Sequence, residues 1–164
     1  MAQRALTSPT FSPTSIADTS ALLDNQHMSV QGSGALDHLE VSEIQIGGQA
    51  TASAVMLMVF ARHSTFGLTP TLGTNGKDAA FQDPNVACTA RGYMSAATDP
   101  ERSATLGLLS LSFNAFGGIV KWFCQQGKPI SIIGNTASLG EAGLSQFTGG
   151  STQAIGAHII YEAA

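Results

Sequence analysis

The pattern of apolar and polar positions between residues 35 and 164 predicts β-strands rather than helices. The strongest segment, residues 52–64, has apolar side chains at successive positions, so a strand there would be apolar on both faces. Its two faces carry Val55, Leu57 and Val59, and Met56, Met58 and Phe60. Such a strand is typical of the centre of a sheet that is buried on both sides. A buried helix is the competing interpretation, but the β-branched residues and the flanking Gly and Thr favour a strand.

Shorter segments alternate in the same way farther along the chain. Residues 39–46 alternate in two pieces with one extra residue between them, which indicates a β-bulge before Gly47-Gly48 ends the strand. Further strands are predicted at residues 86–91, 106–113, 119–124, 130–133 and 154–162, with a shift of phase near Leu108. About seven or eight strands at short, irregular spacing predict an all-β fold, a single β-sandwich or jelly-roll-like domain.

Residues 1–34 differ from this pattern and are interpreted as an extended N-terminal arm, with residues 35–164 as the domain. Two prolines lie among Thr and Ser, and the apolar residues are spaced too widely for the alternation of a strand. Only residues 18–23 could form a helical turn. Alone in water, such a segment would not bury enough apolar surface to offset its ordering entropy. We therefore expect the arm to lie against the domain or across a neighbouring subunit.

Two stretches rich in Gly, Pro, Ser and Thr are predicted as loops. Residues 66–103 contain a hairpin-type turn signal at Asn75-Gly76 and further turn signals at Asp83-Pro84 and Asp99-Pro100. They are interpreted as a long loop excursion of the kind that often contacts partners. Residues 134–153 are predicted to form a second loop before the last strand.

The chain carries unusually little charge. Lys, Arg, Asp and Glu make up 11% of its residues, against about 25% in an ordinary soluble domain. Obligate interfaces resemble a domain core and are poor in charge. We therefore expect part of the surface to be buried against other subunits, with a monomer that has a neutral Ser/Thr surface as the alternative.

The distribution of charge argues against nucleic acid and membrane as partners. The net charge is −4 and the cations are scattered, whereas phosphate backbones are bound by clustered cations. The longest apolar run, residues 54–61, is far too short to span a bilayer. No apolar core follows Arg4, so we expect no signal peptide and synthesis in a cytoplasm. Cys88 and Cys124 match no zinc or redox spacing. Buried thiols are favoured, and whether the two cysteines pair stays open.

No catalytic or metal-binding pattern in the chain is complete. Gly76-Lys77 lacks the following Ser or Thr and the first Gly of a phosphate-binding loop. Ser138 lacks the Gly two residues earlier that a nucleophile elbow needs. The four histidines, which lack the spacing of metal-binding jelly rolls, are His27, His38, His63 and His158. We therefore expect no catalytic residue, no cofactor and no metal, and a protein that is not an enzyme.

Large apolar side chains in the arm and the loops are the candidate contacts to other subunits. Loop aromatic residues either cap the core of their own domain or anchor contacts between subunits. The candidate interface residues are Phe11, Ile16, Leu22, Leu23, Phe66, Phe81, Phe116 and Phe147.

The last third of the chain resembles small virion proteins, in particular the decoration (cement) proteins of tailed-bacteriophage capsids. The residues that carry the resemblance are Lys128–Ile133, Gly149–Thr152 and Ile155–Glu162, within residues 104–162. The resemblance implies a β-sandwich or jelly-roll protein, often trimeric, that binds where capsomers meet and stabilises the shell.

Together these observations predict a structural virion protein that binds and stabilises a capsid shell through arm and loop contacts as a homo-oligomer. Its expected partners are itself, with a trimer favoured, and a capsid or other virion protein. Its expected location is the virion, after assembly in the host cytoplasm. The alternative is a carbohydrate- or receptor-binding β-sandwich module of a fibre or adhesin. Such glycan sites usually present a planar aromatic ring, and the single Trp122 lies in a strand that is predicted to be buried.

Overall fold

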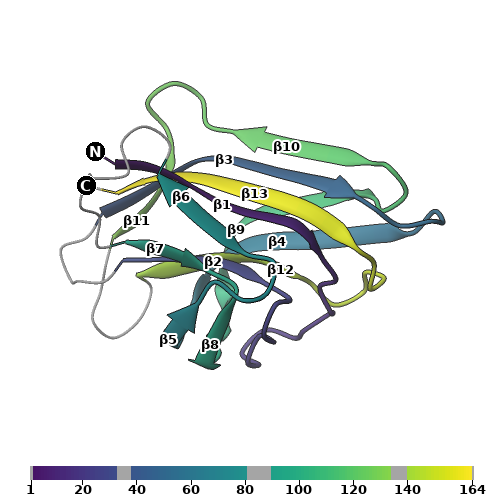
Figure 1. The fold of residues 1–164 in the computed structure, drawn as a ribbon, viewed down its shortest axis with the longest axis horizontal. Helices are drawn as coiled ribbons and strands as arrows, with labels where there is room; N and C mark the ends of the chain where they lie inside the picture. Colours follow the sequence, from purple (N-terminus) through teal and green to yellow (C-terminus); the bar gives the residue numbers. More distant parts are fainter. Residues whose placement is uncertain (1, 33–37, 81–89, 134–139, 164) are drawn as a thin grey trace.

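The computed structural model describes residues 2–32, 38–80, 90–133 and 140–163 of the chain. Every regular element in these residues is a β-strand. Two large sheets pack face to face, and a small third sheet lies beside them (Figure 1). The predicted all-β sandwich is therefore confirmed. The described residues include no helix long and apolar enough to cross a membrane.

The first sheet has the strand order β10-β3-β13-β1-β6, and β11 also pairs with β3. Its strands are β1 (Ala2–Phe11), β3 (His38–Gly48), β6 (Lys77–Ala80), β10 (Ile119–Phe123), β11 (Ile130–Ile133) and β13 (Ile155–Ala163). The second sheet has the order β7-β2-β12-β4-β9. Its strands are β2 (Met28–Gln31), β4 (Val55–His63), β7 (Arg91–Tyr93), β9 (Arg102–Asn114) and β12 (Glu141–Gln146). The small sheet consists of β5 (Leu68–Thr71) and β8 (Ser95–Thr98).

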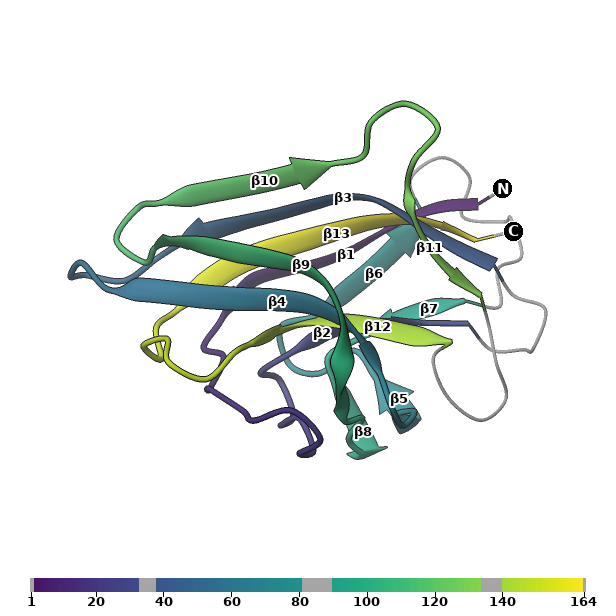
Figure 2. The same cartoon turned by 180° about the vertical axis from the view of Figure 1, so that it is seen from behind.

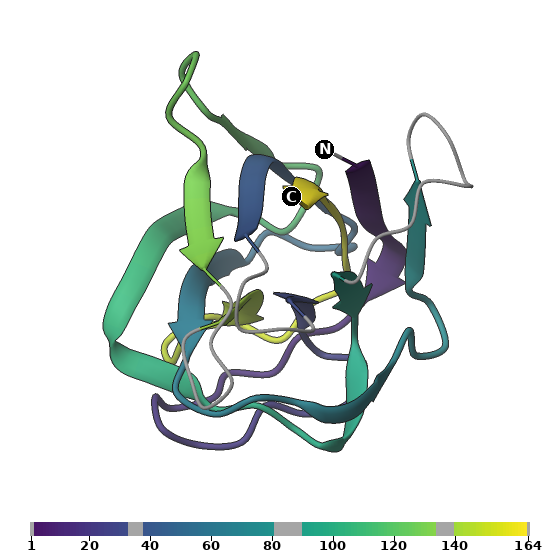
Figure 3. The same ribbon diagram turned by 90° about the vertical axis from the view of Figure 1, so that its left-hand side faces the viewer.

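Eight of these strands are paired as in a jelly roll. In chain order they are β1, β2, β3, β4, β9, β10, β12 and β13. The first pairs with the last, the second with the seventh, the third with the sixth and the fourth with the fifth, all antiparallel. These four nested pairs alternate between the two sheets, which is the double-sheet arrangement of a jelly roll. The view along the strands shows the two sheets enclosing one core (Figure 3).

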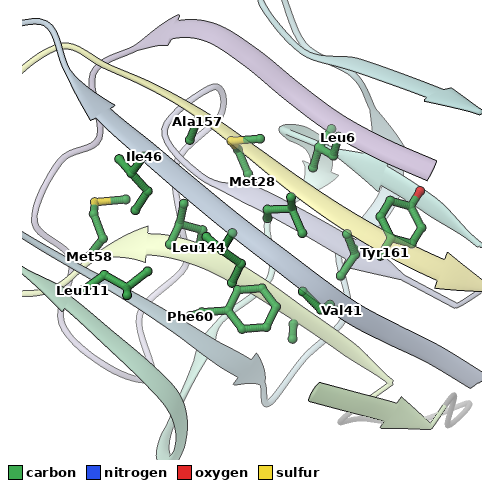
Figure 4. Packing of buried hydrophobic residues seen from close by; sticks show 14 of the residues in the cluster. Leu6, Met28, Val41, Ile46, Met58, Phe60, Leu111, Leu144, Ala157 and Tyr161 are labelled. Carbon is green, nitrogen blue, oxygen red and sulfur yellow. The ribbon is translucent and has the colours of Figure 1, made fainter. Parts of the chain in front are cut away.

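The core lies between the sheets and follows the predicted alternation along β13. Ile155, Ala157, Ile159 and Tyr161 are buried there, while the residues between them are only partly buried. Figure 4 shows side chains from both sheets in this layer, among them Leu6, Met28, Val41, Met58 and Leu144. Full burial of a large apolar side chain contributes about 1.5–3 kcal/mol. This shared layer is therefore the main force that holds the two sheets together.

Strand β4 lies inside the second sheet, as predicted, but only one of its faces is fully buried. The even-numbered residues from Met56 to Phe60 face the core. On the other face Val55 is 68% exposed, and Leu57 and Val59 are partly buried. The prediction that both faces are buried is wrong, because the outer face of this sheet is left partly open along β4.

Residues 2–32 contribute strands to both sheets, which corrects their interpretation as an arm outside the domain. Strand β1 lies between β13 and β6, and β2 lies between β12 and β7. Leu6, Met28 and Val30 are completely buried in the core. The possible helical turn at residues 18–23 is a turn without a helix.

Both stretches that were predicted as loops also contain strands. Residues 66–103 include β5, β6, β7 and β8. The turn at Asn75-Gly76 is present, but it joins β5 to β6, which belong to different sheets, so it does not make a hairpin. Residues 134–153 include β12, a central strand whose residues are all buried. Cys88 and most of the strand predicted at residues 86–91 lie outside the described residues.

Both predicted strand irregularities are confirmed. Strand β13 pairs with the residues on either side of Ser42, which leaves Ser42 as the extra residue of β3. Strand β4 pairs with the residues on either side of Leu108, which leaves Leu108 as the extra residue of β9. The phase of the apolar pattern thus located both bulges.

Candidate functional site

On one side of the sandwich, a carboxylate of the first sheet accepts a hydrogen bond from the second sheet. There β6 of the first sheet contacts β7 of the second. The Asp78 carboxylate accepts a hydrogen bond from the N–H of Gly92 at 2.8 Å and from the Tyr161 hydroxyl at 3.0 and 3.1 Å. It also forms an ion pair with Arg4 at 3.1 Å. Burial and the Asp78 charge raise the pKa of Tyr161, so its hydroxyl keeps the proton that it donates.

The opposite side of the sandwich has two neighbouring edge strands, β9 of the second sheet and β10 of the first (Figure 2). No other described strand pairs with the outer edge of either one. Large apolar side chains are exposed on this side. Phe116 in the turn between the two strands is 60% exposed, and Ile119 and Phe123 of β10 are 71% and 67% exposed. Gathered apolar exposure of this kind is typical of a contact surface.

Strand β9 lacks the features that normally keep an edge strand from pairing. Natural edges are short, or carry Lys or Pro. The shorter edge strands among the described residues follow this rule: β6 begins with Lys77, β7 has 3 residues and begins with the exposed Arg91, and β5 contains Pro70. Likewise, β10 contains Lys121 and β8 has only 4 residues. In contrast, β9 has 13 residues, and from Ser103 to Asn114 it contains neither a charged residue nor a proline.

We use the name open edge for residues Leu109–Asn114, the regularly paired part of β9. Its register with β4 is continuous, whereas the register shifts on the N-terminal side of Leu109. Its inward side chains are Leu109, Leu111 and Phe113, and its outward side chains are Ser110, Ser112 and Asn114. Leu109 and Phe113 pack against the core but are only partly buried, because no strand follows β9.

The structure divides the eight candidate interface residues into three groups. Phe11 and Leu22 are buried within their own chain, so they are not available for a surface contact. Partly buried or exposed are Ile16, Leu23, Phe66, Phe116 and Phe147. Outside the described residues is Phe81. Contacts through the second group stay a prediction, and of these residues Phe116 lies two residues after the end of the open edge.

Part of the outer face of the second sheet is covered by residues 12–27 and by the small sheet of β5 and β8 (Figure 1). Arg102, at the start of β9, is fully buried and ties residues 12–27 to the sheet. Its guanidinium group forms an ion pair with Asp18 at 2.6 Å and donates hydrogen bonds to Ser145 Oγ at 2.8 Å and to the carbonyl of Ile16. The Phe147 ring centroid lies 5.1 Å from the guanidinium carbon, a cation–π contact.

Beneath this cover lies a buried polar cluster centred on Glu141 of β12. One carboxylate oxygen is 2.5 Å from His63 Nδ1 and also accepts the hydroxyl of Tyr93. The other accepts the side-chain amide of Gln31 at 2.8 Å and the N–H of Gly67 at 3.1 Å. Burial and the charge of Glu141 raise the pKa of Tyr93, which keeps this hydroxyl a donor. One carboxylate thus connects β2, β4, β7, β12 and the loop after β4.

Ser29, His63 and Glu141 are the residue types of a nucleophile, a base and an acid, but they are not arranged for nucleophilic attack. Neither Ser29 Oγ nor His63 Nε2 has a hydrogen-bond partner, whereas an activated serine is hydrogen-bonded to its base. All three residues are buried. Burial lowers the pKa of the neighbouring His27 to about 4, so this side chain is neutral at pH 7. In this arrangement the cluster attaches the loop after β4 to the second sheet.

Gly143 of β12 tests how tightly this cluster is packed. A Cβ at this position would lie 2.6 Å from Ser29 Oγ and 2.8 Å from His63 Nε2. We therefore expect Gly143→Ala to lower the free energy of unfolding by about 1–3 kcal/mol, as overpacking of a core does. The measurement is urea denaturation.

The matched control for this variant is Gly47→Ala in β3. A Cβ at position 47 meets no atom within 4 Å, and alanine costs less conformational entropy than glycine on folding. Gly47→Ala should therefore be neutral or slightly stabilising. Equal stability of the two variants would contradict tight packing of the cluster.

An open hollow of about 500 Å³ lies on the outer face of the first sheet. Its floor contains Gly47 and Gly156, which pair with each other on β3 and β13. Gln45, His158 and Ile119 line its sides. The space above Gly47 is open, whereas the Pro9 carbonyl and the Gln49 side chain occupy the space above Gly156. The hollow thus places polar groups around a short piece of open sheet backbone, where a small polar ligand can bind.

Comparison with known proteins adds a likeness to a solved structure. No protein-family model and no curated protein matches the chain. Among solved structures, a chain of a picornavirus capsid, from a massively expanded particle of equine rhinitis A virus, is similar over 98% of this chain and 71% of that chain. The sequence identity is 11% and the TM-score is 0.31. A likeness at this level carries no argument about function, and the jelly-roll assignment rests on the strand pairing.

Proposed function

We propose that this chain is a structural protein of a virion shell, which acts by associating with further copies of itself and not by catalysis. The observation that carries the proposal is the open edge of β9, a long edge strand without charge or proline beside exposed apolar side chains. The low charge of the whole chain supports it. Jelly rolls occur in viral capsids, lectins and cupins, so the fold agrees with the proposal but does not select it.

A narrower form of the proposal is a capsid decoration protein of a tailed phage, with a capsid or other virion protein as its second partner. The resemblance of residues 104–162 to such proteins supports this form, as do the exposed Leu23 and Phe116. Because residues 2–11 are a strand of the first sheet, the contacts would come from sheet edges and loops instead of an N-terminal arm.

Electron microscopy of the purified chain tests the proposal. We expect ordered oligomers or shell fragments to appear as the protein concentration rises. An edge strand without charge or proline leaves backbone hydrogen-bonding groups free to pair with another copy of the chain. The ordering should resist added salt, since the open edge carries no charge to be screened. Single monomers at every concentration and salt would contradict the proposal.

Ligand binding is the second candidate function, and the hollow over Gly47 and Gly156 favours it. Trp122, the single tryptophan of the chain, is partly buried and packs against the core. Any sugar would therefore have to be held by the polar groups of the hollow, such as Gln45 and His158. A glycan screen in which a hit is lost on Gln45→Ala would favour this function, and a screen without hits would remove it.

A further inference from the structure

We propose that the open edge pairs with the open edge of a second copy of this chain, antiparallel and about a two-fold axis at Leu111. The second sheets of the two copies would then form one continuous sheet across the contact. This inference rests on the proposed function and specifies one contact through which the copies would associate. Addition of a strand to a free sheet edge is a common mode of recognition between proteins, and a two-fold contact uses the same surface on both copies.

The register follows from the alternation of the open edge. In a continuous antiparallel sheet, residues directly opposite each other point to the same face. Strands related by a two-fold axis must therefore match inward residues with inward residues. An axis at Leu111 places Leu109 opposite Phe113 of the second copy, and Ser110 opposite Ser112 of the second copy. Apolar side chains then meet on the core side, and hydroxyls meet on the solvent side.

This pairing completes what the single chain leaves open. Leu109 and Phe113 are only partly buried because no strand follows them. A second strand would cover them with like residues and would satisfy the backbone groups of the edge. No charge opposes the contact, because residues 103–120 contain none. Aromatic–aliphatic and Ser–Ser cross-strand pairs are each mildly favourable.

The turn between β9 and β10 would add area to the same contact. The five residues paired about Leu111 span only about 17 Å, which is short for an interface that must bury about 1,200–2,000 Å². Because β9 and β10 lie on one side of the sandwich (Figure 2), an axis through β9 also brings the β10 strands of the two copies toward each other. The exposed Phe116, in the turn between β9 and β10, supplies additional apolar surface. Ile119 and Phe123 point to the outer face of the first sheet, because Val120 and Trp122 between them pack against the core.

A double lysine variant tests the contact. Ser110 and Ser112 are exposed in the single chain, so Ser110→Lys with Ser112→Lys leaves the fold intact. Across the two-fold axis, however, the variant places lysines directly opposite each other, which disfavours pairing. We expect the dissociation constant of the dimer to rise about tenfold or more, measured by sedimentation. The control is Ala97→Lys with Thr98→Lys on the exposed edge of β8, which should not change it.

Cysteine cross-linking tests the register. In chains with Cys88→Ser and Cys124→Ser, one preparation carries Ser110→Cys and another carries Ser112→Cys. Mixed and oxidised with oxidised glutathione, they should form a covalent dimer, since positions 110 and 112 lie opposite each other in the proposed pairing. Either preparation alone should give much less, and a mixture of Ser112→Cys with Thr98→Cys should give none above background.

The outcomes separate this inference from the proposed function. Oligomers that persist in the double lysine variant, or cross-links that are no stronger in the mixture than in the controls, would overturn the two-fold pairing and leave self-association standing. A stable trimer would do the same, because a three-fold contact joins two different surfaces. A native chain that is monomeric at all concentrations would remove both proposals. Loss of dimer with an intact fold, together with the mixed cross-link, supports the inference.

Discussion

Removal of residues 1–11 is expected to prevent the chain from folding. The deletion takes away β1, which pairs with β13 on one side and β6 on the other, and it removes the buried side chains of Leu6 and Phe11. Each of these is worth about 1.5–3 kcal/mol of burial, before the lost strand pairing is counted. A single domain has only about 5–15 kcal/mol of stability in total. Circular dichroism and the yield of soluble protein measure the effect.

The control is an insertion at a turn, which changes the length of the chain without removing a strand. Gly127 lies in an exposed turn between β10 and β11, so two extra glycines after it should leave the unfolding transition nearly unchanged. A shortened chain that folds as well as the insertion variant would contradict the structural role of β1 and would indicate that residues 1–11 lie outside the folded domain.

Replacement of Glu141 by Gln is expected to cause the largest loss among single substitutions. Each of the two carboxylate oxygens of Glu141 accepts two hydrogen bonds. In the glutamine variant one of these oxygens becomes an NH₂ group, which would face two donors and accept from neither. Breaking a buried charged network in this way costs about 3–5 kcal/mol. The measurement is the midpoint and slope of urea denaturation, which separate a loss of stability from a change in the denatured state.

The matched control is Glu43→Gln on the outer face of the first sheet. Glu43 forms ion pairs with Lys121 and His158, both at 2.9 Å, and its side chain is 21% exposed. Ion pairs of this kind contribute about 0–1 kcal/mol. Similar losses for the two variants would contradict a special role of the buried cluster.

The strands whose apolar side chains alternate on their own were predictable from the sequence. Strand β13 is an example, because Ile155, Ile159 and Tyr161 face one core and the residues between them face outward. The bulges at Ser42 and Leu108 were predictable for the same reason, since an extra residue shifts the phase of the pattern.

Strands β1 and β12 could not be recognised from the same signal. Inward positions of β1 include Arg4 and Ser8, which are satisfied by ion pairing or hydrogen bonding, so its alternation is not one of hydrophobicity. Strand β12 is covered on both faces, and one face packs against a polar layer. Its outward residues are therefore Glu141, Gly143 and Ser145, and the whole strand resembles a polar loop in sequence.

The candidate site was only partly predictable. The low charge predicts contacts between subunits, which stay a prediction, and the run without charge from Ser103 to Val120 is visible in the sequence. Which strand ends a sheet, however, depends on pairing between distant segments. Of the candidate interface residues, Phe11 and Leu22 are buried within their own chain. The sequence alone does not distinguish a large apolar residue that fills the core from one that contacts another subunit.

The sedimentation mass of the native chain, measured beside the Ser110→Lys, Ser112→Lys variant, tests the central claim most directly. We expect the native chain to associate as its concentration rises and the variant to stay monomeric with the same circular dichroism spectrum. A native chain that sediments as a monomer throughout the range, with no difference from the variant, would contradict self-association through β9. The hollow on the first sheet would then be the next place to look for function.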